Sequence, residues 1–241
     1  MHTKLFLPII VATLLFSSCE SEWVEVVKGS GPVVSEDRNT SSFDEVTLSI
    51  PADVYIYQGI DEGITIEAQD NVLDVIRTEV KSNELNIRFE NRVVVKRYDP
   101  IKVFITTNDL SEIQISGSGN VYNETPIVTN ELRIRISGSG NVDLHDIDTP
   151  SLDARISGSG KVYLAGICAD QYLQISGSGN VHAYNLLSET ADINISGSGK
   201  TELTVADYMN VQISGSGNVY YKGHPDIDSR ISGSGGIYSI Q

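Results

Sequence analysis

Hydrophobic and polar residues alternate along most of this chain, with the period of a β-strand that buries one face. In the first half, alternating runs lie at residues 46–50, 53–57, 63–67, 85–89 and 102–106. In the second half, the alternation leads repeatedly into the pentapeptide Ile-Ser-Gly-Ser-Gly, which begins at residues 115, 136, 156, 175, 195, 213 and 231. The pattern predicts an all-β protein whose second half is built from repeats.

Successive copies of the pentapeptide begin 21, 20, 19, 20, 18 and 18 residues apart. A period that keeps its glycines while its spacers vary in length is typical of a β-solenoid with one copy per coil. We therefore predict a parallel β-helix-like solenoid of 18–21 residues per coil over residues 111–241, right-handed by the crossover rule. Residues 33–110 are expected to begin or cap it within the same continuous domain, because an open end would expose unpaired strand edges.

Aligning the copies on their isoleucine, counted as position zero, indicates which side chains face inward. Positions −4, −2, 0 and +6 are mostly apolar and are expected to form the core. The glycines between positions 0 and +6 allow a sharp corner. We expect the serine hydroxyls to satisfy the backbone amides of that corner.

Position +5 is asparagine in four copies, which are Asn120, Asn141, Asn180 and Asn218. Stacked asparagines at a corner can hydrogen-bond along the stack, so we interpret them as a structural column of asparagines at the corner. The same position is lysine in two other copies, which disfavours calcium between the coils, since calcium requires several oxygen ligands. We expect neither a metal nor a cofactor.

Position +7 carries aromatic side chains in five of the seven copies, with Asp143 and Glu202 in the other two. The aromatic members are Tyr122, Tyr163, His182, Tyr220 and Tyr238. Flat rings along a rigid rod can stack on sugars, and carboxylates can accept hydrogen bonds from sugar hydroxyls, so this column is the candidate ligand-binding face. The alternative is that the tyrosines only pack across neighbouring strands.

The N-terminus has the pattern of an exported lipoprotein. Residues 1–18 combine Lys4 with an apolar run too short to span a bilayer, which indicates a signal peptide. The sequence Phe16-Ser-Ser-Cys19 resembles a lipobox, although leucine is usual at the phenylalanine, and the resemblance implies lipidation of Cys19. Residues 19–32 are expected to be a flexible tether, and Glu20-Ser-Glu22 resembles the surface-export signal of Bacteroidota lipoproteins. We therefore expect a lipid-anchored, surface-exposed protein of the outer membrane, with a periplasm-facing one as the alternative.

The net charge and the two cysteines indicate which partners and which membrane link to expect. The formal net charge of −15 argues against nucleic acid as a partner and against adsorption to anionic lipid. The membrane link is therefore expected to be Cys19. The second cysteine, Cys168, has no basic neighbour in its small apolar segment and is predicted to be a buried hydrophobic residue.

Several segments together resemble one known family. They are 29–38, 43–46, 51–59, 70–74 and the serial Ser-Gly-Ser-Gly-Asn-Val, and they resemble the head-GIN domain family of putative auto-transporter adhesins over residues 29–241. The resemblance implies a parallel β-helix-like fold and a cell-envelope lipoprotein common in Bacteroidota. It brings no catalytic residues and no ligand.

These observations favour a non-enzymatic cell-surface lipoprotein that binds glycan, matrix or envelope components through an exposed face, with unknown oligomeric state. A structural envelope protein without a soluble ligand is the first alternative. A polysaccharide lyase or hydrolase is the second, because β-helices host such enzymes and position −1 places Arg135 and Arg155 on adjacent coils. No cluster of acids in the same register accompanies these arginines, which disfavours catalysis.

Overall fold

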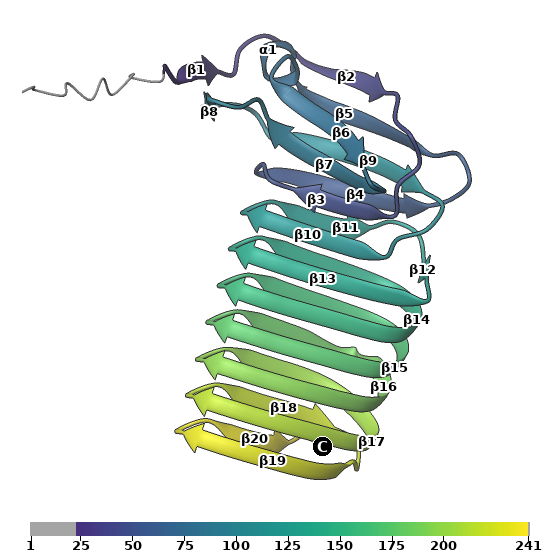
Figure 1. The fold of residues 1–241 in the computed structure, drawn as a ribbon, viewed down its shortest axis with the longest axis vertical. Coiled ribbons are helices and arrows are strands. Elements are labelled where there is room, and N and C mark those ends of the chain that lie inside the picture. The colour runs from purple at the N-terminus through teal and green to yellow at the C-terminus, as the bar shows by residue number, and fades with distance from the viewer. Residues whose placement is uncertain (1–22, 241) are drawn as a thin grey trace, which may run out of the picture.

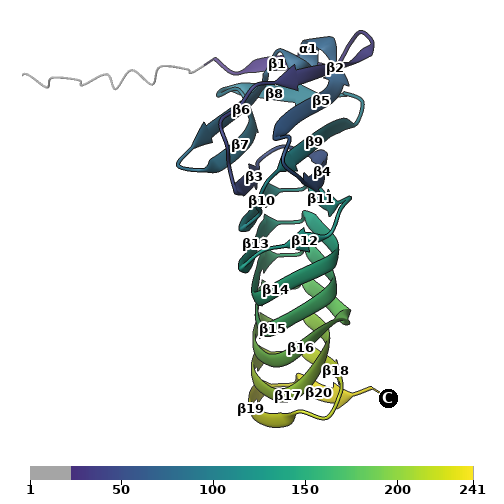
Figure 2. The same ribbon diagram turned by 90° about the vertical axis from the view of Figure 1, so that its right-hand side faces the viewer.

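The computed structural model describes residues 23–240, which form a tall stack of parallel β-coils beneath a shorter group of N-terminal strands (Figure 1). The predicted all-β parallel solenoid is confirmed. One short helix, α1 (Asp70–Leu73), interrupts the strands of the described chain. Figure 2 shows that the N-terminal strands form a layer wider than the stack beneath them.

The N-terminal strands are β1 (Glu25–Lys28), β2 (Val33–Arg38), β3 (Glu45–Leu48), β4 (Ala52–Gln58), β5 (Gly63–Gln69), β6 (Ile76–Lys81), β7 (Glu84–Phe89), β8 (Val93–Lys96) and β9 (Ile101–Thr107). The coils follow as β10 (Glu112–Gly117), β11 (Asn120–Asn123), β12 (Ile127–Val128), β13 (Glu131–Gly138), β14 (Asn141–Gly158), β15 (Lys161–Gly177), β16 (Asn180–Gly197), β17 (Lys200–Gly215), β18 (Asn218–Lys222), β19 (Asp226–Gly233) and β20 (Gly236–Ser239).

Each coil contributes strand segments to two long parallel sheets, and a short third segment, such as Ile127–Val128 against Ile147–Asp148, pairs from coil to coil between them. The segments that lead into the pentapeptide form the pentapeptide sheet, and the segments that follow its corner form the opposite sheet. Equivalent positions are in register from coil to coil, as when Ile136 pairs with both Ile115 and Ile156. Across the corner, Val142 pairs with Val121 and Val162 in the same way.

The core lies between these two sheets. The first isoleucine of six copies is almost fully buried, and so is position +6 in the first six copies. The predicted inward columns are therefore confirmed over most of the stack. Ile231, in the last coil, is the exception at 42 % exposure, because no other strand of residues 23–240 pairs with the far edge of β19.

The parallel stack begins earlier than the repeat. Strands β3 and β4 continue the register of the coils without a pentapeptide, since Val46 pairs with Ile113 and Val54 pairs with Val121. Strands β7 and β9 add a further layer, parallel to β3 and β4. The expected boundary at residue 111 is therefore a boundary of the repeated sequence, whereas parallel stacking reaches back into residues 45–107.

The N-terminal strands also close this end of the stack. Strand β5 lies antiparallel to β9, and β6 lies antiparallel to β7, so both outermost parallel strands have a partner. Strand β2 then pairs antiparallel with the other edge of β5. The predicted cap is thus present, and it ends the parallel stacking by reversing strand direction. The expected tether needs a correction, because residues 25–28 form β1 and pair with β8.

The two glycines of each pentapeptide are required for partly different reasons, as the fifth copy shows. Gly197 has φ +134°, a conformation that disfavours any Cβ. Gly199 has no such φ, but a Cβ there would lie 2.5 Å from Cγ2 of Ile175 in the preceding coil. Both glycines therefore let adjacent coils approach, because a Cβ at Gly197 would also lie 2.3 Å from the carbonyl oxygen of Gly177, and the first glycine turns the chain as well.

The corner amides are satisfied by backbone, and the expectation for the serine hydroxyls is wrong. The amide of Ser198 donates to the carbonyl oxygen of Gly177 at 2.8 Å, and that of Lys200 donates to Gly179 at 3.3 Å. This pattern recurs from coil to coil and leaves the serine side chains exposed. In-register stacking brings the carbonyl of the coil above within reach, so the hydroxyls are not needed.

We expect Gly197→Ala to lower the free energy of unfolding by about 3 kcal/mol, through backbone strain and overpacking. Its Cβ would lie 2.3 Å from the carbonyl oxygen of Gly177, a backbone atom that cannot move independently. Urea denaturation monitored by circular dichroism measures the effect. Gly63→Ala is the control, because no heavy atom lies within 4 Å of that Cβ, and equal losses in both variants would contradict the argument.

One inward position carries a polar side chain without a partner. Gln171 is 1 % exposed, lies between Leu152 and Ala191 in its column, and neither Oε1 nor Nε2 finds a hydrogen-bond partner among the described residues. We expect Gln171→Leu to raise the free energy of unfolding by about 1–3 kcal/mol, because an unpaired buried amide costs that much. Urea denaturation tests this expectation, and a destabilised variant would show that the amide has an essential partner.

Candidate functional site

The position +7 column lies on the outer face of the opposite sheet and is longer than the sequence indicated. Strand pairing joins its seven members to Tyr55 of β4 and Phe104 of β9. We call this column the ladder, and its members in spatial order are Phe104, Tyr55, Tyr122, Asp143, Tyr163, His182, Glu202, Tyr220 and Tyr238. The two additions were missed because no pentapeptide sets their register. The alternation in β4 and β9 was the available signal.

Most rings of the ladder stack on one another. Centroids are 5.3 Å apart for Phe104 and Tyr55, and 5.4 Å apart for Tyr55 and Tyr122. Farther along, they are 4.7 Å apart for Tyr163 and His182, and 5.1 Å apart for Tyr220 and Tyr238. Such pairs stabilise the sheet. They also cover many of the ring faces, so a ligand can reach a ring face only where the stacking is interrupted.

Glu202 interrupts the stack but is held by its neighbours. Its carboxylate lies 2.5 Å from Nδ1 of His182 and forms an ion pair with Lys200, whose ammonium group lies 5.2 Å from the ring centroid of Tyr220. Burial alone would raise the pKa of Glu202, but the hydrogen bonds from Lys200 and His182 outweigh it and lower the pKa. This interruption is therefore filled by a network of charges.

Asp143 interrupts the stack differently. Its side chain is exposed, and its carboxylate has no hydrogen-bond or ion-pair partner anywhere in residues 23–240. Tyr122 and Tyr163 pair with it from the two adjacent coils. Burial raises the pKa of Tyr122, and the negative charges of Asp53 and Asp143 raise it further, so the phenol remains a hydrogen-bond donor at neutral pH.

The asparagines at position +5 border the ladder and use their side chains in two ways. Near the cap, Nδ2 of Asn141 donates to Oδ1 of Asn120 at 2.8 Å, and Nδ2 of Asn120 donates to Asp53 at 2.8 Å. Farther along, Oδ1 of Asn180 and of Asn218 each accepts from a backbone amide of the next coil, at 3.2 and 3.1 Å. All four side chains are thus committed to neighbouring coils.

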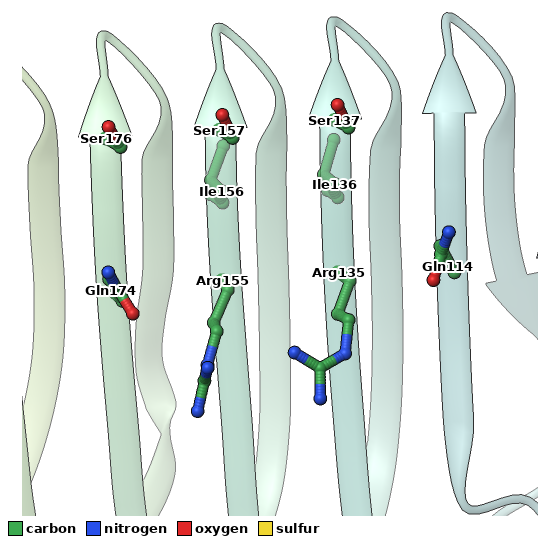
Figure 3. Close-up of a pocket in the computed structure, with 9 residues that line it drawn as sticks. All are labelled: Gln114, Arg135, Ile136, Ser137, Arg155, Ile156, Ser157, Gln174 and Ser176. Atoms are coloured by element: carbon green, nitrogen blue, oxygen red, sulfur yellow. The ribbon is translucent and has the colours of Figure 1, made fainter.

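The outer face of the pentapeptide sheet carries a shallow groove (Figure 3). It is lined by Gln114, Arg135, Ile136, Ser137, Arg155, Ile156, Ser157, Gln174 and Ser176. Nε of Arg135 lies 2.7 Å from Glu112, and Arg155 makes two contacts with Asp153 at 2.7 and 2.9 Å. These carboxylates neutralise both arginines. The groove is therefore a neutral hydrogen-bonding surface without a free cation for an acidic substrate.

Metal-binding groups and membrane-spanning helices are both absent from the described part of the chain. Residues 23–240 contain no group of three His, Cys, Asp or Glu side chains placed to hold a metal ion. No helix of that range is long and apolar enough to cross a membrane. Cys19 lies outside the described residues.

Cys168 is buried at 8 % exposure, which confirms its predicted place in the core. Burial, with a smaller effect of Asp170, raises the pKa of its thiol to about 12. A thiol reacts as its thiolate, so reactivity should be very low near neutral pH.

We expect a chain that starts after Cys19 to react with a disulfide reagent at pH 8 at least about 100-fold more slowly when folded than in guanidinium chloride. With a pKa near 12, only about one thiol in 10⁴ is ionised at that pH. Absorbance of the released thiolate follows the reaction. Similar rates in the folded and unfolded states would show that Cys168 is accessible.

The geometry defines a class of protein, a capped parallel β-solenoid whose two long sheets each present an outer face to solvent, one of them with an aromatic column. Over residues 42–225 the sequence matches the family described as "Putative auto-transporter adhesin, head GIN domain". The chain belongs to this family, as the resemblance implied. No curated protein matches it.

Several solved structures share this fold. A putative adhesin from Bacteroides fragilis is 27 % identical, with a TM-score of 0.85, and the match covers 89 % of this chain and 100 % of that one. A putative adhesin from Parabacteroides merdae is 20 % identical, with a TM-score of 0.74 and coverage of 90 % and 100 %. A protein from Parabacteroides distasonis titled a putative lipid binding protein is 23 % identical, with a TM-score of 0.74 and the same coverage. At these identities, the Parabacteroides structures establish the fold alone.

Proposed function

We propose that this protein is a non-enzymatic, cell-surface adhesin that binds glycan or another envelope or matrix component through the ladder. The observation that carries the proposal is the ladder itself, nine in-register side chains of which seven are aromatic. A rigid column presents the same chemistry at each coil step, which suits a polymer with repeated units. The adhesin label of the family and of the Bacteroides fragilis relative supports this function.

We further propose that Cys19 carries a lipid anchor in the outer membrane. Acyl chains contribute about 0.8 kcal/mol per buried methylene, so several chains anchor a protein stably. Strand β1 lies at the cap end of the molecule, far from the last coils (Figure 1). An anchor preceding β1 would hold the cap near the membrane and direct the repeated coils away from it.

A structural envelope protein remains the second candidate, and one observation favours it. Four ring pairs of the ladder already cover part of each other's faces, which is what cross-strand packing alone would produce. Such a protein would stabilise the envelope without a saturable soluble ligand. The neutralised arginines of the groove give the enzyme alternative no comparable support.

We expect the soluble chain that starts after Cys19 to bind saturably to at least one feature of a glycan and matrix-protein array. The double variant Tyr163→Ala, Tyr220→Ala should lose at least about fivefold in affinity, because each aromatic contact contributes about 0.5–1.5 kcal/mol.

The matched control is Tyr172→Ala, Tyr208→Ala, which removes two tyrosines that are 49 % and 43 % exposed and lie outside the ladder. This control should bind like the unmodified chain. Absence of binding to every feature would exclude the simple adhesin and favour the structural role.

A further inference from the structure

The ladder has one opening that its own residues do not fill, at Asp143. Tyr122 and Tyr163 lie on the coils on either side, in register with it. An aspartate side chain ends near the position where a tyrosine ring begins. Beyond the carboxylate, the space between the two rings therefore lacks a ladder side chain, and Tyr163 is accordingly 37 % exposed despite stacking on His182.

We propose that this opening is a binding subsite for one pyranose ring, held between Tyr122 and Tyr163 with its hydroxyl groups donating to Asp143. The inference rests on the proposed function, since it specifies the subsite and ligand class of the same face. The sugar would occupy the place of the missing ring and make the stack continuous from Phe104 to His182.

The spacing suits such a ligand. Coils are about 4.8 Å apart, so two coil steps place the flanking rings about 9.6 Å apart. A ring midway between them lies about 4.8 Å from each, close to the 4.7 Å that separates Tyr163 from His182. A puckered pyranose is thicker than an aromatic ring and fills this spacing more completely, because carbon atoms pack best at about 3.5–4.0 Å.

The polar groups point to the same ligand. An ionised aspartate only accepts hydrogen bonds, and Asp143 has no donor among the described residues, so it needs a ligand rich in donors. The comparison with Glu202 is informative, because that carboxylate is already bound to His182 and Lys200. Of the two carboxylates in the ladder, only Asp143 is free to bind a ligand.

Saturation-transfer NMR with methyl glycosides of glucose, galactose, mannose and N-acetylglucosamine tests the subsite. At least one glycoside should bind with a Kd of about 1 mM, the affinity expected for about 13 non-hydrogen atoms of ordinary efficiency, with saturation on its ring protons. In Asp143→Tyr the new ring should fill the opening and weaken binding at least tenfold, while the melting temperature stays the same or rises. Unchanged stability would show that the loss of binding is not a loss of folding.

Two control variants and a cationic ligand test whether the opening is specific for a sugar. Asp192→Tyr makes the same substitution on the pentapeptide sheet and should leave binding unchanged. Asp143→Asn keeps the size and an acceptor oxygen, and should bind the sugar within about fivefold. Choline, tested in parallel, should bind more weakly than the best glycoside.

The proposal is overturned if no glycoside binds, if binding survives Asp143→Tyr, or if choline binds more tightly and is lost in Asp143→Asn. The last result would identify a site for organic cations. Failure of the subsite is distinguishable from failure of the adhesin function. An array signal that depends on Tyr163 and Tyr220 but not on Asp143 would preserve the function and exclude this subsite.

Discussion

In-register stacking of parallel coils is the constraint on which the rest of this structure depends. It requires successive backbones to meet at every corner, where the second glycine of one coil lies against the isoleucine and glycine of the preceding coil. It also supplies the carbonyl groups that satisfy the corner amides. The side chains buried within one coil of about 20 residues do not offset the conformational entropy lost when that coil becomes ordered. Only stacking against neighbouring coils therefore makes the fold stable.

The same constraint produces the ladder. The register is kept from the pentapeptide through position +7, and the register shifts between coils fall after that position. A residue preference at position +7 therefore becomes a continuous column of side chains. The cap extends that column through Tyr55 and Phe104, because its strands β4 and β9 keep the register of the coils. Column residues can therefore act as a unit, either by packing together or by binding a ligand where packing is interrupted.

The two interruptions show how neighbouring residues decide the chemistry of a carboxylate. Glu202 is long enough to reach His182 and Lys200 and becomes part of the packing. Asp143 is shorter and has Tyr122 and Tyr163 beside it, neither of which hydrogen-bonds to it. Two acidic residues at the same repeat position thus have different capacities to bind a ligand, and the asparagines beside them are engaged by adjacent coils.

The sequence by itself determined the repeat, the inward columns, the glycine corners and the burial of Cys168, because these depend on local spacing and on the alternation of strands. Tertiary structure decided where parallel stacking begins, since β3, β4, β7 and β9 carry no pentapeptide to set their register. It also decided that the serine hydroxyls are unnecessary at the corner and that Gln171 lies unpaired in the core. Tertiary structure also decided which carboxylate of the ladder has no partner. Hydrogen bonds between coils join residues about 20 positions apart, and local sequence does not specify those contacts.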